Sequence, residues 1–147
     1  MFAYVQDDAK FYVGELDSEF SLATVAKGEL LLEVFGDIVH GQMDEGGDIP
    51  RLPPWRVGSR LFWSAQRLEI WTRVQYADDQ GRPRDFESST RWNLGGEYGI
   101  PVNNRELMAF VELKNIGDEE IRLSTSFLRD VAPESGRSLT AGFRYFF

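Results

Sequence analysis

The residues that could do chemistry in this chain are few, and the densest group lies around residue 40. His40 is the only histidine, and the acidic stretch that follows it contains Asp44, Glu45 and Asp48. Imidazole and carboxylate groups are ligands for zinc or calcium, so these four side chains form a candidate metal contact. Their spacing, however, matches no EF-hand loop. We therefore interpret the stretch as a solvated loop and expect no metal site.

A second candidate is the pair Arg82 and Arg84, which flank a proline and could attract an anionic chelate. A surface turn with charged residues is the ordinary interpretation of such a segment. The chain has no cysteine, and any histidine-based triad would depend on His40 alone. Gly95 and Gly96 lie in a strand pattern without a following helix, so no phosphate loop is indicated. The sequence therefore points to neither an enzyme nor a bound cofactor.

Composition narrows the class of protein further. The chain has 147 residues, a formal net charge of −8, 42% hydrophobic residues and 27% charged residues, which fits one folded domain. The acidic balance argues against a nucleic-acid partner, because phosphate binding needs a basic stripe. No stretch approaches the roughly 18 apolar residues of a transmembrane helix. The first residues do not resemble a signal peptide, so we expect that one has been removed or that the chain is a piece of something longer.

The elements that would position these residues are β-strands, because apolar and polar side chains alternate along most of the chain. In the clearest case, every second residue from 139 to 147 is hydrophobic. The alternation predicts about seven strands, at 12–22, 30–38, 55–64, 67–77, 89–98, 106–115 and 138–147, and a fragment at 2–6. We expect an all-β fold, an antiparallel meander of about 7–8 transmembrane strands of an outer-membrane β-barrel.

The connections between these strands sort by length. If the last strand ends on the periplasmic side, the long connections 43–54, 78–87 and 116–135 all lie outside the cell. The short connections 25–28, 65–66 and 100–105 then all lie on the periplasmic side, and a tight bend near Asp7 and Asp8 is the one short outer connection. This sorting is typical of outer-membrane barrels. Each strand is also long enough to cross a hydrocarbon layer when tilted.

The two faces of the predicted strands differ in chemistry. Aromatic residues near strand ends suit an interfacial girdle better than a core; they are Tyr12, Trp63, Tyr76, Trp92, Tyr98 and Phe147. The charged residues fall on the opposite face, which would line the inside of a barrel. A soluble all-β barrel would alternate in the same way, with the charged face toward solvent, and stays an alternative. Glycines inside strands can relieve crowding where a neighbouring aromatic leans across; they are Gly36, Gly58, Gly95, Gly96 and Gly142.

Several segments resemble the end of TonB-dependent outer-membrane receptors, the active transporters of siderophores, metals and similar scarce solutes. Residues 11–17 (FYVGELD) resemble a strand with an aromatic residue, a glycine and an alternating Glu-Leu run. Residues 49–54 (IPRLPP) resemble the segment that ends an outer loop and opens the next strand, and its prolines suit a strand entrance. Residues 115–120 (NIGDEE) resemble the element after the penultimate strand. Residues 126–133 (SFLRDVAP), followed by 136–138 (GRS), resemble the final outer loop and the start of the last strand. These segments follow one another in the family's order.

The last eight residues carry a further resemblance. Thr140, Gly142, Tyr145 and Phe147 fit the polar–x–Gly–x–x–aromatic–x–aromatic pattern that the barrel-assembly machinery reads in outer-membrane proteins. A plain amphipathic last strand is the alternative interpretation. The expected location is accordingly the bacterial outer membrane, with membrane lipid and the assembly machinery as partners.

The resemblance implies a larger protein. Receptors of this family have a barrel of about 22 strands around a plug, and the TonB complex acts on the plug. This chain shows no plug or signal peptide, so residues 1–147 are expected to be the C-terminal part of such a barrel, a fragment of an active transporter. The alternatives are a self-contained eight-stranded outer-membrane barrel with a structural or adhesion role, and a soluble ligand-binding β-barrel. The transported substrate cannot be named, and His40, Asp44, Glu45, Asp48, Arg82 and Arg84 are the outer-loop candidates for contacting it.

Overall fold

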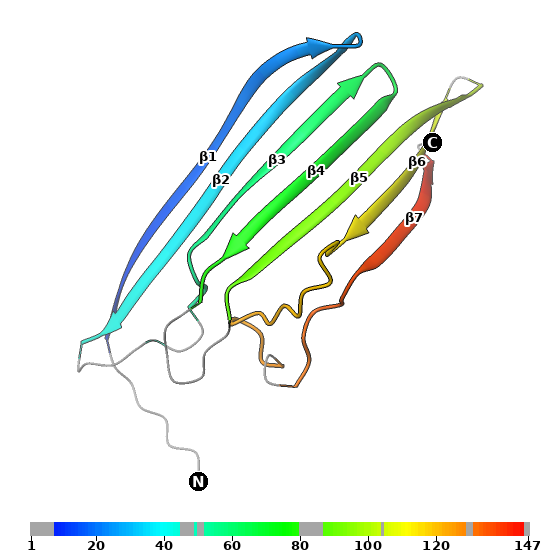
Figure 1. The fold of residues 1–147 in the computed structure, drawn as a ribbon. Helices are drawn as coiled ribbons and strands as arrows, with labels where there is room; N and C mark the ends of the chain where they lie inside the picture. The colour runs from blue at the N-terminus through cyan, green and yellow to red at the C-terminus, as the bar shows by residue number, and fades with distance from the viewer. Residues whose placement is uncertain are drawn as a thin grey trace.

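A computed structural model describes residues 8–44, 49, 52–79, 87–103, 105–128 and 131–145. These residues form one antiparallel sheet of seven strands, arranged in chain order as a meander (Figure 1). The strands are β1 (Ala9–Val25), β2 (Gly28–Met43), β3 (Arg56–Ala65), β4 (Leu68–Ala77), β5 (Ser89–Val102), β6 (Arg105–Lys114) and β7 (Ser138–Tyr145). No helix in the described part of the chain is long and apolar enough to cross a membrane.

The predicted all-β meander is confirmed. All seven predicted strands are present, but β1 and β2 are longer than predicted because their ladder continues from Val25 and Gly28 out to Ala9 and Met43. The strand β5 is also longer and runs to Val102, into the connection predicted at 100–105. The fragment predicted at 2–6 lies outside the described residues. Leu22 does not simply continue the alternation of β1. Ser21 pairs with Leu31 and Ala23 with Leu30, so Leu22 forms a β-bulge.

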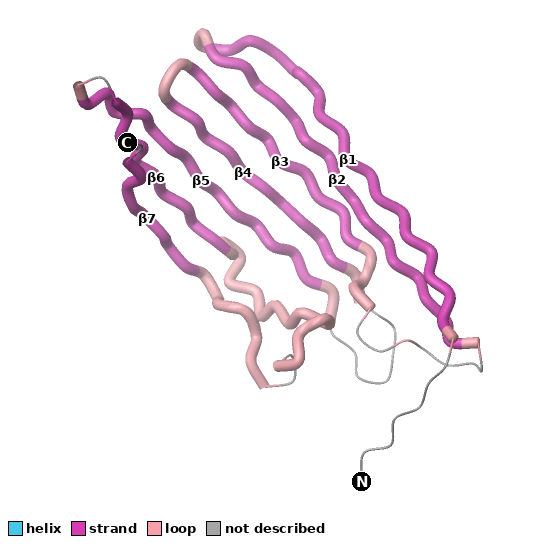
Figure 2. The backbone as a smooth tube through the Cα atoms, turned by 180° about the vertical axis from the view of Figure 1, so that it is seen from behind, coloured by secondary structure: helices cyan, strands magenta, loops and turns pink. Residues whose placement is uncertain are grey.

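Short turns join the strands at one end of the sheet. Ala26 and Lys27 connect β1 to β2 with φ of 51° and 65°, the left-handed pair that a two-residue hairpin turn needs. Gln66, with φ of 51°, opens the turn between β3 and β4, and Asn103, with φ of 54°, opens the turn between β5 and β6. The longer connections lie at the opposite end (Figure 2). The predicted sorting of connections by length is therefore confirmed for the seven strands.

The strand register divides the sheet into two faces of different chemistry. Cross-strand partners share a face, and one series of partners runs Leu32, Leu61, Thr72, Leu94, Leu113 and Leu139 from β2 to β7. We call this side the apolar face. The residues between them in sequence form the polar face, where one series runs Glu33, Arg60, Arg73 and Asn93. From β2 to β7 the register is unbroken, so each residue stays on the same face as its cross-strand partners.

The described residues form no second layer over the sheet, so little of it is buried. Ile121, 4% exposed, is the only buried hydrophobic residue among those described, and it lies in the segment after β6 rather than in a strand. The two edges, β1 and β7, lie on opposite sides of the sheet in Figures 1 and 2. Within the described residues β1 pairs only with β2 and β7 only with β6. Both edges therefore present unpaired backbone N–H and C=O groups.

Candidate functional site

The apolar face carries no charged side chain except at strand ends. Lys10 and Arg105 are the only Asp, Glu, Lys or Arg residues on this face of the described strands, each near the end of its strand, and His40 lies on the same face. Between the strand ends many large hydrophobic side chains are exposed, from 38% for Leu61 to 70% for Leu139, whereas others, such as Leu32 and Val34, are half-buried. Contiguous exposed apolar patches above a few hundred Å² are rare on soluble monomers, which makes this face a candidate for contact with an apolar partner.

Aromatic side chains lie near both ends of the apolar face, and their polar atoms are satisfied locally. At the loop end, the Trp55 and Tyr76 rings contact each other at a tilt of 49°, with centroids 5.3 Å apart. Both donate to the Asp78 carboxylate, Trp55 Nε1 at 2.6 Å and Tyr76 Oη at 3.0 Å. At the turn end, Trp63 Nε1 donates to the Val25 carbonyl at 3.0 Å. This combination of an apolar ring and a bonded polar atom is typical of interfacial aromatics.

The aromatic residues predicted near strand ends are placed accordingly. Five of them lie on the apolar face: Tyr12, Trp63, Tyr76, Trp92 and Tyr98. Phe147 lies outside the described residues. Sequence reasoning missed Trp55, which lies two residues before Val57 and so shares its face. The signal was this two-residue spacing, which the prolines before Trp55 obscured.

On the polar face, aromatic rings lie over glycines of the neighbouring strand. Phe35 faces Gly58, Trp71 faces Gly95 and Phe110 faces Gly142 as direct cross-strand partners. A Cβ at these glycines would meet the ring at 2.4, 2.5 and 2.9 Å respectively. The prediction that strand glycines make room for a leaning aromatic is confirmed at these three positions.

The other two strand glycines accommodate backbone rather than rings. A Cβ at Gly36 would lie 3.1 Å from the Arg56 carbonyl oxygen, and one at Gly96 would lie 2.9 Å from the Glu69 carbonyl oxygen. At these two positions, therefore, the missing side chain makes room for the backbone of the neighbouring strand and not for an aromatic ring.

An arginine side chain lies over each of the three polar-face rings, those of Phe35, Trp71 and Phe110. Arg73 lies over Phe35 with Cζ 4.3 Å from the ring centroid, Arg60 over Trp71 at 5.2 Å, and Arg144 over Phe110 at 4.6 Å. Stacking on an aromatic ring orients a guanidinium group and is favourable by about 0.5–1 kcal/mol at exposed sites. We refer to these three groups of aromatic, glycine and arginine as the polar-face triads.

Ion pairs link three arginines of the polar face, Arg56, Arg60 and Arg144, to carboxylates of other strands. Arg56 donates to both carboxylate oxygens of Asp37, from Nε at 3.0 and 3.1 Å and from Nη2 at 2.9 Å. Arg60 pairs with Glu33, and Arg144 with Glu97, each at 3.5 Å. The polar face is thus a network of charges that tolerates water, which fits a hydrated surface and not the interior of a protein core.

Beyond β6 the chain turns back onto β5 through a buried asparagine. Asn115 is 4% exposed, and its side chain donates to the Glu119 carbonyl at 2.8 Å and accepts from the Glu119 N–H at 3.1 Å. Its own N–H donates to Asn93 Oδ1 at 2.9 Å, and the Thr90 N–H donates to the Glu119 carboxylate at 2.6 Å. The element at 115–120, singled out in the sequence for its resemblance, is therefore a hydrogen-bonded turn attached to β5.

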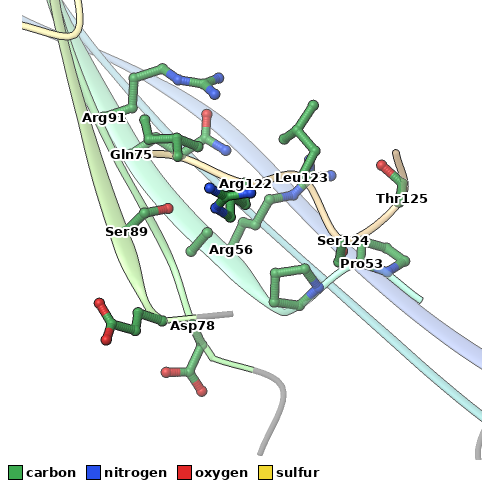
Figure 3. A pocket seen from close by; sticks show the side chains of 14 residues that line it. Pro53, Arg56, Gln75, Asp78, Ser89, Arg91, Arg122, Leu123, Ser124 and Thr125 are labelled. Carbon is green, nitrogen blue, oxygen red and sulfur yellow. The ribbon is translucent and has the colours of Figure 1, made fainter. Parts of the chain in front are cut away.

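The segment that follows covers the loop end of the polar face. A cavity of about 90 Å³ lies there, between Arg56, Gln75 and Arg91 of the strands and residues 121–125 of the segment (Figure 3). Ser124 Oγ donates to the Leu52 carbonyl at 3.2 Å, and Arg91 pairs with Glu134. These contacts hold the described residues 115–128 and 131–134 against the loop end of the sheet.

Neither a protein-family model nor a curated protein matches this chain. The residues predicted to contact a metal or substrate are only partly within the described structure. His40 is exposed on β2 opposite Tyr12, and the Asp44 carboxylate forms an ion pair with Lys10 Nζ at 3.0 Å. Glu45, Asp48, Arg82 and Arg84 lie outside the described residues. Over the part of the chain that the structure describes, no group of three or more potential metal ligands occurs.

Three of the four residues of the predicted assembly signal lie on β7. Thr140 and Gly142 belong to the polar face, opposite Glu112 and Phe110, and Tyr145 belongs to the apolar face, opposite Leu107. Phe147 lies outside the described residues. The described part of the signal is therefore an exposed edge strand with one polar and one apolar face.

Proposed function

We propose that this chain forms part of the wall of a bacterial outer-membrane β-barrel, with its apolar face toward lipid and its polar face toward the lumen. The observation that carries the proposal is the apolar face itself, which is free of Asp, Glu, Lys and Arg between the ends of all seven described strands and leaves many of its large side chains exposed. Lipid covers such a face without a second protein layer. The aromatic residues near both ends and the sorting of turns and loops support the same arrangement.

A soluble ligand-binding barrel is the main alternative for such a sheet. It would have to enclose the apolar face as its interior, yet aromatic residues with polar atoms bonded at the strand ends suit an interface better than a core. Within the described residues β1 and β7 each pair on one side only, and a larger barrel would supply the neighbouring strands that both edges need.

We propose further that the complete barrel is an active transporter of the TonB-dependent class, for a siderophore, metal or similar scarce solute. The support is the order of the receptor-like segments along the chain, together with the loop-end turn at 115–119 and the polar face that would line the lumen. In this arrangement TonB does its work on a plug, and the wall supplies a hydrated inner surface.

The membrane part is tested with the chain's own tryptophans. Trp92 and Trp63 lie on the apolar face and Trp71 on the polar face. Three variants that each keep one of these residues, with the other tryptophans changed to phenylalanine, are refolded into vesicles whose acyl chains carry bromine, which quenches nearby indole fluorescence. Trp92 and Trp63 should be quenched by the lipid and Trp71 should not, whereas aqueous iodide should quench Trp71.

Equal behaviour of all three tryptophans, or a monomeric protein that stays soluble without detergent, would overturn the membrane proposal. The transport part has a separate test, which is the coding sequence in the same reading frame upstream of Met1. Further alternating strands and a plug domain are expected there. A gene without them would overturn the transporter while leaving the tryptophan result in place.

A further inference from the structure

A hollow on the polar face of β4 and β5 is lined by side chains that can all donate hydrogen bonds. Its volume is about 150 Å³, and Arg73, Gln75, Arg91 and Asn93 line it. Arg73 is paired across the strands with Asn93, and Gln75 with Arg91, so the two arginines stand on one diagonal of a four-residue square. No carboxylate lines the hollow. The volume is well above the roughly 10–15 Å³ that a single water molecule requires.

One positive charge of the hollow has no counterion among the residues that the structure describes. Arg91 pairs with Glu134. Arg73 instead stacks over Phe35, and no ion pair to its guanidinium is found in the part of the chain that the structure describes. Arg73 also lies directly across from Arg60, and like charges in that position repel. An anion bound beside Arg73 would relieve this repulsion.

The donors are held in place by their other contacts. Because Asn93 Oδ1 accepts the N–H of Asn115 at 2.9 Å, its Nδ2 group is left as a donor. The ring of Phe35, 4.3 Å from Cζ of Arg73, orients that guanidinium. A planar guanidinium beside two amide groups offers the forked set of donors that a group with several acceptor oxygens requires.

A second arginine of the polar face provides the contrast. Arg144 stacks over Phe110 as Arg73 stacks over Phe35, but Glu97 lies 3.5 Å from it and neutralises its charge. Stacking on an aromatic ring is therefore common to both arginines. Of the two, only Arg73 lacks a counterion among the described residues and lies beside amide side chains.

We infer that the hollow formed by Arg73, Gln75, Arg91 and Asn93 binds the oxyanion group, carboxylate or phosphate, of a dissolved solute. The binding itself requires only the polar face. The identification of that solute as an anionic transport substrate rests on the proposed function, in which this face lines the lumen.

The test uses the full chain refolded in zwitterionic detergent micelles and titrated by calorimetry with inorganic phosphate and, separately, with citrate. Ionic strength is held constant with sodium chloride so that general screening does not change. Saturable binding of at least one probe is expected. Preference for phosphate identifies a phosphate subsite and preference for citrate a carboxylate subsite, and either result supports the inference.

Arg73→Gln should weaken this binding by about tenfold or more, because a charge-assisted forked contact is lost. The matched control Arg144→Gln should change the affinity by less than about twofold, since that arginine lies outside the hollow. Arg73→Lys, which keeps the charge and loses the fork, should give an intermediate affinity. In the unaltered chain, the side-chain Nε–H resonance of Arg73 should move on titration, a readout that does not depend on whether a variant folds.

Absence of saturable binding by both probes, or equal weakening by Arg73→Gln and Arg144→Gln, would overturn the inference. Failure here and failure of the proposed function are distinguishable. A chain whose tryptophans contact lipid but which binds no anion refutes only the oxyanion site. Anion binding by a chain that makes no contact with lipid refutes only the membrane wall.

Discussion

Two adjacent leucines of β2 offer a matched test of what each face of the sheet contacts. Leu32 belongs to the apolar face, where its partners are Phe20 and Leu61. Leu31 belongs to the polar face, where its partners are Ser21 and Phe62. Substituting lysine at either position removes the same apolar side chain and adds the same charge. The difference between the two variants therefore reports on the environment of the face.

The expected magnitude follows from that environment. A lysine on a lipid-facing position near the middle of a barrel strand costs about 2–4 kcal/mol, so Leu32→Lys should lower the equilibrium constant for folding by roughly 30-fold to 1,000-fold. On the polar face, the same ammonium at position 31 lies between the side chains of Glu29 and Glu33, two residues away on either side. We expect Leu31→Lys to lower the free energy of unfolding by less than about 1 kcal/mol. The loss of apolar contact destabilises the fold, and an exposed ion pair with the neighbouring carboxylates offsets part of that loss.

The assay is reversible unfolding in urea of the chain refolded into phosphatidylcholine vesicles, followed by tryptophan fluorescence. The measurement is repeated in vesicles of shorter acyl chains. If Leu32 faces lipid, the cost of the lysine should fall in the thinner bilayer, because its ammonium reaches the interface more easily. A protein core would make the cost independent of the lipid. Equal destabilisation by the two variants, or a Leu32→Lys cost that ignores bilayer thickness, would refute the assignment of the faces.

Two further predictions concern residues that hold the sheet and its loop end together. Asn115→Ala should destabilise the fold by about 2–3 kcal/mol, since it removes two side-chain hydrogen bonds and places alanine at φ of 50°. The control is Asn103→Ala, at φ of 54° on an exposed turn, which has only the backbone cost and should lower the free energy of unfolding by about 1 kcal/mol. Urea unfolding of the two variants compares these losses. Gly95→Ala should displace the Trp71 ring, which a Cβ would approach to 2.5 Å, and should cost about 1–3 kcal/mol with a changed near-ultraviolet circular dichroism signal. Gly117→Ala, where the nearest atom is 3.8 Å away, should leave both stability and spectrum nearly unchanged, and the idea is wrong if the two glycine variants behave alike.

The strands and their faces could be predicted from the sequence because one periodic signal fixes both. Every second residue of β4, from Leu68 to Tyr76, is hydrophobic or threonine, and this pattern defines a strand and its faces without knowledge of its neighbours. The bulge at Leu22 could not be predicted in this way. Leu22 fits the alternation of its own strand, and its irregular position appears only once β1 is paired with β2.

The hollow around Arg73 was beyond sequence reasoning for the same reason. Arg73 and Gln75 are separated from Arg91 and Asn93 by a long connection, and only the register of β4 on β5 brings the four together. Whether an acidic residue lies close enough to Arg73 to pair with it likewise depends on how the strands are arranged in the sheet. Asn115 was singled out by its resemblance to a family element, but its burial and its bonds to Glu119 follow from how the chain folds back after β6.

The polar-face triads have a consequence for how this architecture can change over time. The ring-on-glycine contacts join β2 to β3, β4 to β5 and β6 to β7, which are the strand pairs linked by the long connections. Where a tight turn joins two strands, the turn itself sets their alignment. Where a long connection joins them, an interlocking ring and glycine can set it from within the sheet. The long connections can then change in length and sequence without causing a one-residue shift in register, which would move every side chain of a strand to the opposite face. Their sequences can therefore diverge while the sheet keeps its structure.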